Sequence, residues 1–330
     1  MILLYILIIK QVNREFCFWN FNKKITMNRN KYGNNTIIKR KGDVVKLIVI
    51  YPKFPLGNMV DPDWEEEYNM VSSMDGIETG LYDSEEKRLI LKNVAEEAFF
   101  LYRGWMQREG EELPHLFQKY RWWSETEQIK MGNSSFYWTK VLEPFLIGPT
   151  YMYSNEMLND LKIEFDLNSI EALAEKLYLV MSEKLGFSIF MKDGVKSAIR
   201  PVINSKEEMA EGLKEMINYT ENFRDGLVFK PAVFVENERR FFCWKSGKIV
   251  GGFLVLPEIF ENSTKEEEDF LIKIIETVDL ELELNFFTLD IAYADGKLVL
   301  VELGHGEYSS LKETDTLMFA KKLEEISKSL

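Results

Sequence analysis

Short apolar runs alternate with helical patterns along most of the chain. Residues 45–51 (VKLIVIY) form a continuous apolar run, which is typical of a strand buried on both faces. The pattern then predicts a short helix from about residue 63, a second strand, a helix over 84–97 and a short strand over 98–102. This order indicates an α/β domain built on a parallel sheet.

Arg103 lies directly after the last of these strands. An open α/β sheet usually places its site at the carboxyl ends of its strands, so Arg103 is a candidate for orienting a substrate. A surface arginine stacked on the nearby Trp105 fits the same local sequence.

The second half of the chain again mixes strands and helices. Capping residues and helical spacing predict three internal helices and one terminal helix. Between them lie apolar runs that predict strands, one broken by Pro231 and another entering a hairpin through Gly247. The predicted helices are 169–185, 206–219, 265–278 and from about 314 onward, and an aromatic-rich segment that we expect to connect two domains is 107–160.

Two lysines flank a glycine-containing turn after one of these strands. Lys192 and Lys196 bracket Asp193-Gly194-Val195. A lysine at a strand end beside a glycine can neutralise phosphate oxygens, although this spacing does not match the P-loop pattern. A solvated surface lysine is the ordinary alternative.

Arg240 lies beside a run of aromatic residues in a later predicted strand. A guanidinium at such a position can fix a planar carboxylate or phosphate through two parallel hydrogen bonds. The alternative is an ion pair with Glu236 or Glu238.

Residues 286–311 are predicted to form a β-hairpin that carries two acids. Two apolar runs flank Ala294-Asp295-Gly296, which is a strong hairpin signal. Each run contains one carboxylate, Asp290 or Glu302, among apolar neighbours. A carboxylate in a half-buried strand is costly unless something pairs with it.

The length of the loop decides whether the two acids meet. A two-residue turn at Asp295-Gly296 would send Glu302 to the face opposite Asp290. A three-residue loop with a left-handed Gly296, which we expect, makes Glu302 the same-face diagonal neighbour of Asp290. Two carboxylates that close repel unless a cation or a proton lies between them, and Mg²⁺ is the natural candidate. An ordinary hairpin whose acids face solvent or pair with lysines is the alternative.

Composition narrows the class of protein. The 330 residues carry a formal net charge of -13, which argues against a nucleic-acid-binding surface. Cys17 and Cys243 have no metal-ligand or redox spacing, which indicates a reducing, cytoplasmic compartment. Residues 1–9 are apolar but shorter than the roughly 20 residues that span a bilayer. We expect residues 1–44 to be a poorly structured extension.

Several phrases, in this order, resemble the ATP-grasp superfamily, and more closely a branch of bacterial and phage ATP-grasp proteins. They are DPDWEEEY after the first strand, LYRGWM at 101–106, MKDGVKS at 191–197, ERRFF at 238–242 and FFTLDIAYADGKLVLVELGHGE at 286–307. The resemblance implies an α/β (α+β) chain in which two α+β subdomains clamp a nucleotide behind a smaller N-terminal α/β domain. We therefore expect an N-terminal domain with its connector over 45–165 and an ATP-grasp domain over 166–330.

The resemblance also implies roles for individual residues. Lys192 is expected to contact ATP, Asp290 and Glu302 to hold Mg²⁺ on the phosphates, and Arg240 to face the transferred phosphoryl group. The remaining residues expected to contribute to nucleotide binding are Lys196, Lys230, Glu238 and His305.

Two departures from the branch bear on activity. His305 and Glu307 stand where the branch often has aspartate and glutamine. Lys230 stands where arginine is usual, and a lysine lacks the bidentate geometry of a guanidinium.

The implied activity is an ATP- and Mg²⁺-dependent carboxylate–amine ligase that acts through an acylphosphate. Its substrates are expected to be small-molecule or peptide acids and amines, with Arg240 and Arg103 in catalytic roles. We expect neither a nucleic acid nor a membrane as a partner. The alternatives are a non-catalytic nucleotide-binding assembly factor and a small-molecule phosphotransferase that uses the same site.

Overall fold

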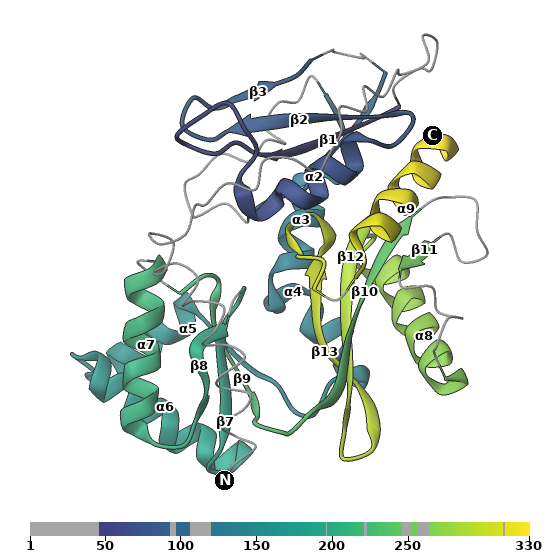
Figure 1. Cartoon of the computed structure of the whole chain (residues 1–330). Coiled ribbons are helices and arrows are strands. Elements are labelled where there is room, and N and C mark those ends of the chain that lie inside the picture. Colours follow the sequence, from purple (N-terminus) through teal and green to yellow (C-terminus); the bar gives the residue numbers. More distant parts are fainter. Residues whose placement is uncertain are drawn as a thin grey trace, which may run out of the picture. The chain divides into compact units, whose positions relative to one another are not determined.

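A computed structural model describes residues 46–92, 97–105, 120–195, 197–220, 223–245, 253–256, 264–312 and 314–330. These residues form three sheets with flanking helices (Figure 1). The extension expected over residues 1–44 lies outside the described part.

The first sheet is built around the buried apolar run. β1 is buried along its whole length and pairs in parallel with β2 and with β4, as expected for an open α/β sheet. The strand order is β3-β2-β1-β4-β5, and β3 is antiparallel to β2. The strands are β1 (Leu47–Pro52), β2 (Ile77–Asp83), β3 (Arg88–Ile90), β4 (Phe99–Tyr102) and β5 (Arg121–Trp122).

The helix predicted over 84–97 is wrong for the part that the structure describes. The Asp83 carboxylate accepts a hydrogen bond from the Glu86 backbone N–H, and Lys87 adopts a left-handed φ of 49°. The chain therefore turns tightly and returns as β3. Pairing with β2 outweighs the helix propensity of the Glu, Lys, Arg and Leu residues in this segment.

The second sheet has the order β6-β9-β7-β8, with every neighbouring pair antiparallel. Helices α6 and α7 cover it and share a buried cluster with Met191. Because β6 pairs with β9, this sheet begins at Tyr151, before the domain boundary expected at residue 166. The elements are β6 (Tyr151–Ser154), α5 (Asn155–Glu164), α6 (Ile170–Leu185), β7 (Ile189–Asp193), β8 (Ser197–Ile203), α7 (Lys206–Thr220) and β9 (Gly226–Pro231).

The third sheet is antiparallel, with the order β11-β10-β12-β13, and α8 packs against it through Ile274 and its neighbours. Thr264 and Glu267 form the capping box that starts α8. The hairpin predicted around Gly247 is confirmed by the pairing of β10 with β11, although its loop lies outside the described residues. The elements are β10 (Glu236–Lys245), β11 (Phe253–Leu256), α8 (Lys265–Glu281), β12 (Phe286–Ala294) and β13 (Lys297–His305).

The aromatic-rich connector contains regular structure that the sequence pattern did not predict. It includes α3 (Thr126–Asn133), α4 (Ser135–Val141) and the 3₁₀ turn η4 (Glu143–Phe145). Trp123 and Trp138 are buried in two hydrophobic clusters, so these tryptophans serve as core.

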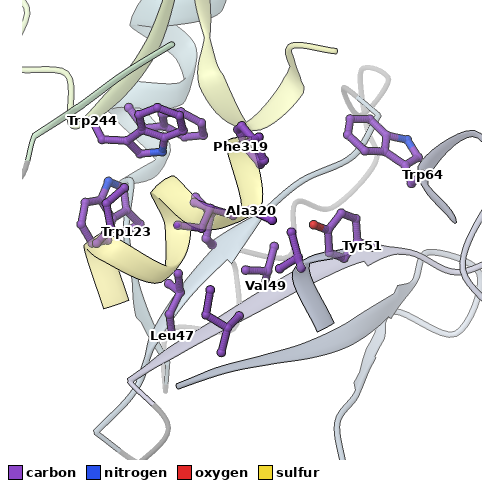
Figure 2. Close-up of a cluster of buried hydrophobic side chains, with 14 of the residues drawn as sticks. Leu47, Val49, Tyr51, Trp64, Trp123, Trp244, Phe319 and Ala320 are labelled. Atoms are coloured by element: carbon purple, nitrogen blue, oxygen red, sulfur yellow. The ribbon is translucent and has the colours of Figure 1, made fainter. Parts of the chain in front are cut away.

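The terminal helix α9 (Thr316–Ser329) joins the first and third sheets in one buried cluster. Figure 2 shows Phe319 and Ala320 of α9 near Val49 of β1 and Trp244 of β10. α9 also packs against α2 (Glu65–Ser72), which follows the 3₁₀ turn η2 (Pro62–Trp64). Residues of α9 therefore complete the hydrophobic cluster beside the first sheet.

Candidate functional site

The hairpin turn between β12 and β13 contains two residues. Ala294 pairs with Lys297, and the residues between them, Asp295 and Gly296, have φ values of 50° and 73°. Positive φ at both central positions is typical of a type I′ turn. The predicted three-residue loop is therefore wrong.

Asp290 and Glu302 nevertheless lie directly opposite one another. The register shifts between Asp290 and Ile291, because Ile291 pairs with Leu300 whereas Asp290 pairs with Glu302. Val301 is the extra residue of a β-bulge, and one extra residue moves every later side chain to the other face. The bulge thus brings the two acids together after a turn that would otherwise separate them.

Arg240 of β10 pairs in register with Asp290, so Arg240, Asp290 and Glu302 form a row across three neighbouring strands. Its guanidinium donates from Nε to Oδ1 of Asp290 and from Nη2 to Oδ2, both at 2.7 Å. Burial opposes the charge on Arg240, but the hydrogen bonds to Asp290 and the charges of Asp290, Glu302 and Glu238 together outweigh burial and raise the pKa of the guanidinium. The ion pair considered with Glu236 or Glu238 is instead a bidentate pair with Asp290.

The second sheet contributes a lysine to the same place. Lys192 of β7 is 4% exposed and donates a hydrogen bond from Nζ to Oε1 of Glu302 at 2.8 Å. The side chain of Glu302 is 40% exposed, and its partial burial opposes ionisation. Lys192, Arg240 and Lys230 together outweigh this effect, so the pKa of the carboxyl is lowered. Glu302 is therefore ionised at neutral pH.

Lys230 lies beside Lys192 on the neighbouring strand. Lys192 pairs with Val228 of β9, which makes Lys230 its diagonal neighbour on the same face. The Lys230 ammonium is 5.4 Å from the ring centroid of Trp138. Burial and the charge of Lys192 together lower the pKa of Lys230 to about 8, against the attraction of Glu302.

Lys312, which the sequence did not single out, completes the cluster. Its Nζ donates to Oδ2 of Asp290 and to Oε1 of Glu238, each at 2.8 Å. Burial and the charge of Arg240 oppose the charge on Lys312, but Asp290 and Glu238 together outweigh them and raise the pKa of Lys312. Glu238 thus belongs to the cluster through Lys312.

The cluster has an excess of positive charge. Four cations (Lys192, Lys230, Arg240 and Lys312) face three carboxylates (Glu238, Asp290 and Glu302), which leaves one net positive charge in a chain whose formal charge is -13. The acids are paired with cations, as the ordinary-hairpin interpretation expected. The three cations in these pairs, Lys192, Arg240 and Lys312, come from three segments of the chain and are largely buried. The cluster can therefore accept a further anion.

Asp290 and Glu302 fit Mg²⁺ only as part of a shell that a phosphate ligand and water complete. In the described ranges no three His, Cys, Asp or Glu side chains gather as a metal site. Mg²⁺, however, often binds proteins through one or two carboxylates and completes its shell with phosphate oxygens and water. Asp290 and Glu302 are such a pair, so they fit an ion that binds together with a phosphate ligand.

Arg103 does not join the cluster. It lies at the carboxyl end of β4 as expected, but it is fully buried and makes a bidentate pair with Glu67 at 2.8 and 2.9 Å. Its third nitrogen donates to the carbonyls of Gly306 and Ser309. The guanidinium packs on Trp64 and not on Trp105. The catalytic role expected for Arg103 is therefore not supported, because its guanidinium is occupied by the protein.

His305 also lies apart from the cluster. It is three positions beyond Glu302 on β13, and residues three apart in a strand face opposite sides of the sheet. The imidazole is fully buried, accepts a hydrogen bond from the Glu307 N–H, and packs where α3 approaches at Gly132. In this structure His305 caps the 3₁₀ turn η5 (Gly306–Tyr308), and its expected contact with a nucleotide stays a prediction.

The turn after β7 contributes little backbone to the cluster. The N–H of Gly194 donates to the carbonyls of Arg224 and Gly226, and the N–H of Val195 donates to Asp193. Both groups are therefore used within the protein. Lys196, the second lysine of this turn, lies outside the described residues.

No protein-family model matches the sequence, and no curated protein matches it. Several solved structures match the fold of this chain. The D-alanine–D-alanine ligase from Coxiella burnetii is 11% identical, with a TM-score of 0.57 over 86% of this chain and 94% of that one. A D-cycloserine synthetase is 13% identical, with a TM-score of 0.55 over 85% and 99%. The D-alanine–D-alanine ligase from Bacillus anthracis, complexed with ATP, is 13% identical, with a TM-score of 0.50 over 87% and 94%.

At these identities the likeness concerns the fold. The matches extend over nearly the whole length of each neighbour and over at least 85% of this chain. These neighbours are ATP-grasp proteins, as the sequence phrases suggested. The two α+β units and the parallel sheet that precedes them thus give this chain the fold of these ATP-grasp proteins.

Proposed function

We propose that the chain is an ATP- and Mg²⁺-dependent carboxylate–amine ligase. The observation that carries this proposal is the row of Arg240, Asp290 and Glu302 across three strands, with Lys192 and Lys230 facing it from the second sheet. Phosphoryl transfer asks a protein mainly to position its reactants and to stabilise charge. A cluster made only of charged side chains supports that task.

Each residue has a distinct role in the proposal. Lys192 and Lys230 bind phosphate oxygens of ATP, and Arg240 faces the phosphoryl group that is transferred. Asp290 and Glu302 hold Mg²⁺, which when bound neutralises charge on the phosphates. The cations that now pair with these acids then turn to the phosphate oxygens.

The proposed reaction has two steps. An oxygen of the substrate carboxylate attacks the γ-phosphorus of ATP, the bond to the β-phosphate oxygen breaks, and ADP and an acylphosphate result. An amine then attacks the acyl carbon, loses a proton and displaces phosphate, which leaves an amide. The seven side chains of the cluster include no hydroxyl or thiol, which agrees with direct attack by the substrate.

The names of the structural neighbours support this class. The neighbours include D-alanine–D-alanine ligases, whose names describe the joining of small amino acids. We therefore propose small-molecule or peptide acids and amines as substrates and the cytoplasm as the location. In the described ranges no helix combines the length and the apolar character of a membrane span.

The replacement of Glu302 by Gln tests the proposal. It keeps the size of the side chain and removes its charge, so Mg²⁺-dependent ADP release stimulated by a pool of amino acids and short peptides is expected to be lost while the circular dichroism spectrum is kept. Glu276→Gln, on an exposed position of α8, is the matched control and is expected to retain turnover. Full turnover in Glu302→Gln would contradict the assignment.

One observation favours a non-catalytic assembly factor as the second candidate. Asp290 already accepts three hydrogen bonds from Arg240 and Lys312, so its oxygens are occupied by cations of the protein. Tight ATP binding without stimulated ADP release would support this candidate. ADP release without amide formation would instead support a phosphotransferase.

A further inference from the structure

Lys312 and Arg240 share one oxygen of one carboxylate. Arg240 donates from Nη2 to Oδ2 of Asp290 at 2.7 Å, and Lys312 donates from Nζ to the same oxygen at 2.8 Å. The bidentate guanidinium alone neutralises Asp290. Lys312 is therefore a second cation on a carboxylate that is already paired.

The backbone holds Lys312 in an uncommon conformation. Its φ is 51°, in the left-handed region, which costs a lysine about 1–2 kcal/mol relative to ordinary helical backbone. Strained residues of this kind cluster at functional sites. The ammonium of this residue lies in the cluster, and the side chain is 18% exposed.

The segment that carries Lys312 is anchored from two sides. Arg103 donates to the Ser309 carbonyl at 2.9 Å, and the hydroxyls of Ser309 and Thr288 are hydrogen-bonded at 2.9 Å. Arg240 donates from Nη1 to the carbonyl of Ser310 at 3.1 Å. The buried Arg103 therefore helps to fix the position of Lys312 from the first domain.

Lys312 and Arg240 lie at one end of the row that Arg240, Asp290 and Glu302 form across β10, β12 and β13. Lys192 contacts Glu302 on β13, whereas Lys312 contacts Asp290 on β12 and Glu238 on β10. Directly opposite residues on neighbouring strands have Cβ atoms about 4.5–5.5 Å apart, so the two lysines act on different parts of an elongated anion. Arg240 and Lys312 converge on one oxygen of Asp290, so the two cations can turn together to one further anionic group. A terminal phosphate, which carries about two negative charges, is such a group.

We propose that Lys312, together with Arg240, binds the terminal phosphate of a nucleoside triphosphate, and that Lys192 and Lys230 bind its inner phosphates. This assignment rests on the proposed function, because it assumes that the cluster binds a nucleotide. It adds a residue to the site and a means of distinguishing a triphosphate from a diphosphate. The Lys312 ammonium moves from its carboxylate partners to phosphate oxygens when the ligand binds.

Calorimetric titration of the full chain with Mg-ATP and with Mg-ADP tests the proposal. Lys312→Met is expected to weaken ATP binding by about tenfold to a hundredfold, the effect of losing one charged hydrogen bond, and to change ADP binding by less than about twofold. Lys312→Arg keeps the charge and is expected to restore most of the preference for ATP. Lys245→Met removes a lysine of β10 that pairs with Asp279, and it is expected to leave both affinities unchanged.

These variants are expected to fold. Asp290 keeps Arg240 as its partner, and the side chain of Glu238 is already 39% exposed in the unaltered chain. Lys312→Gly removes both the ammonium and the backbone strain, because glycine adopts a positive φ without cost. It is expected to lose the same preference for ATP, which would show that the preference depends on the ammonium and not on the strained backbone. Normal nucleotide binding with an unchanged ATP-to-ADP ratio in Lys312→Met would overturn the role of Lys312 alone. Failure of the unaltered chain to bind either nucleotide would overturn the proposed function and this assignment with it.

Discussion

Asp290 and Glu302 lie directly opposite one another on β12 and β13, although the turn that joins these strands has only two residues. The bulge at Val301 reconciles the two observations, because it adds one residue to β13 between the turn and Glu302. Bulges often re-aim a side chain beside a functional site. Here the bulge determines whether a pair of acids exists on one face of the sheet.

Asp290→Asn is expected to destabilise the protein more than Arg240→Met. The first change removes the partner of two largely buried cations, whereas the second leaves Asp290 paired with Lys312. Breaking a buried ion pair from one side costs about 3–5 kcal/mol. Urea denaturation of the two single variants and the double variant measures this, and we expect the double variant to cost less than the sum of the single ones. Strict additivity would show that the two side chains do not interact.

Arg103→Met is expected to lower the free energy of unfolding by about 3–5 kcal/mol, because it leaves the Glu67 carboxylate buried without its bidentate partner. The double variant Glu67→Gln/Arg103→Met is expected to recover part of this loss. Urea denaturation measures both. A stable Arg103→Met variant with impaired turnover would instead support the substrate-orienting role that the sequence predicted.

The sequence pattern predicted the parts of the site that depend on local signals. Apolar runs identified the strands that carry Lys192, Arg240, Asp290 and Glu302, and the contacts of these four residues confirm that the fold brings them together. Successive side chains of a strand point to opposite faces of the sheet, and this alternation depends only on the local backbone. It can therefore be read from the sequence without knowledge of distant contacts.

The incorrect predictions depend on long-range contacts or on backbone conformation. Glu67 lies 36 positions before Arg103, and no local pattern links the two residues. The sequence pattern did not single out Lys312. Its place in the cluster depends on a positive φ and on a partner on β12, and no local sequence signal predicts either. His305 lies apart from the cluster because the strand is still regular where a flexible glycine turn was expected.

Lys230 is expected to make stability depend on pH. Its pKa falls from 10.5 to about 8 in the folded chain, so between these values the unfolded chain binds more protons and stability rises with pH. Below about pH 8 the full penalty of a buried cation is present, on the order of 2–3 kcal/mol. Lys230→Met is therefore expected to be more stable than the unaltered chain at pH 7, with the difference shrinking toward pH 10.5.

Denaturation midpoints of the unaltered chain and Lys230→Met at pH 7, 8, 9 and 10 measure this difference. Lys206→Met removes an exposed lysine of α7 that pairs with Glu175, and it is expected to show no such convergence. A gap between the unaltered chain and Lys230→Met that stays constant from pH 7 to 10 would mean that Lys230 titrates normally.

Gly296 tests the turn on which the register of the hairpin depends. Its φ is 73°, and a Cβ added there would have no atom within 4 Å, so a substitution meets a conformational cost and no steric clash. Gly296→Ala is expected to lower the free energy of unfolding by about 1–2 kcal/mol, whereas Gly296→Asn is expected to cost less because asparagine tolerates the left-handed region. Urea denaturation measures both. If Gly296→Ala proved as stable as the unaltered chain, the two-residue turn would be wrong, and the bulge at Val301 would no longer be needed to bring Asp290 and Glu302 to one face.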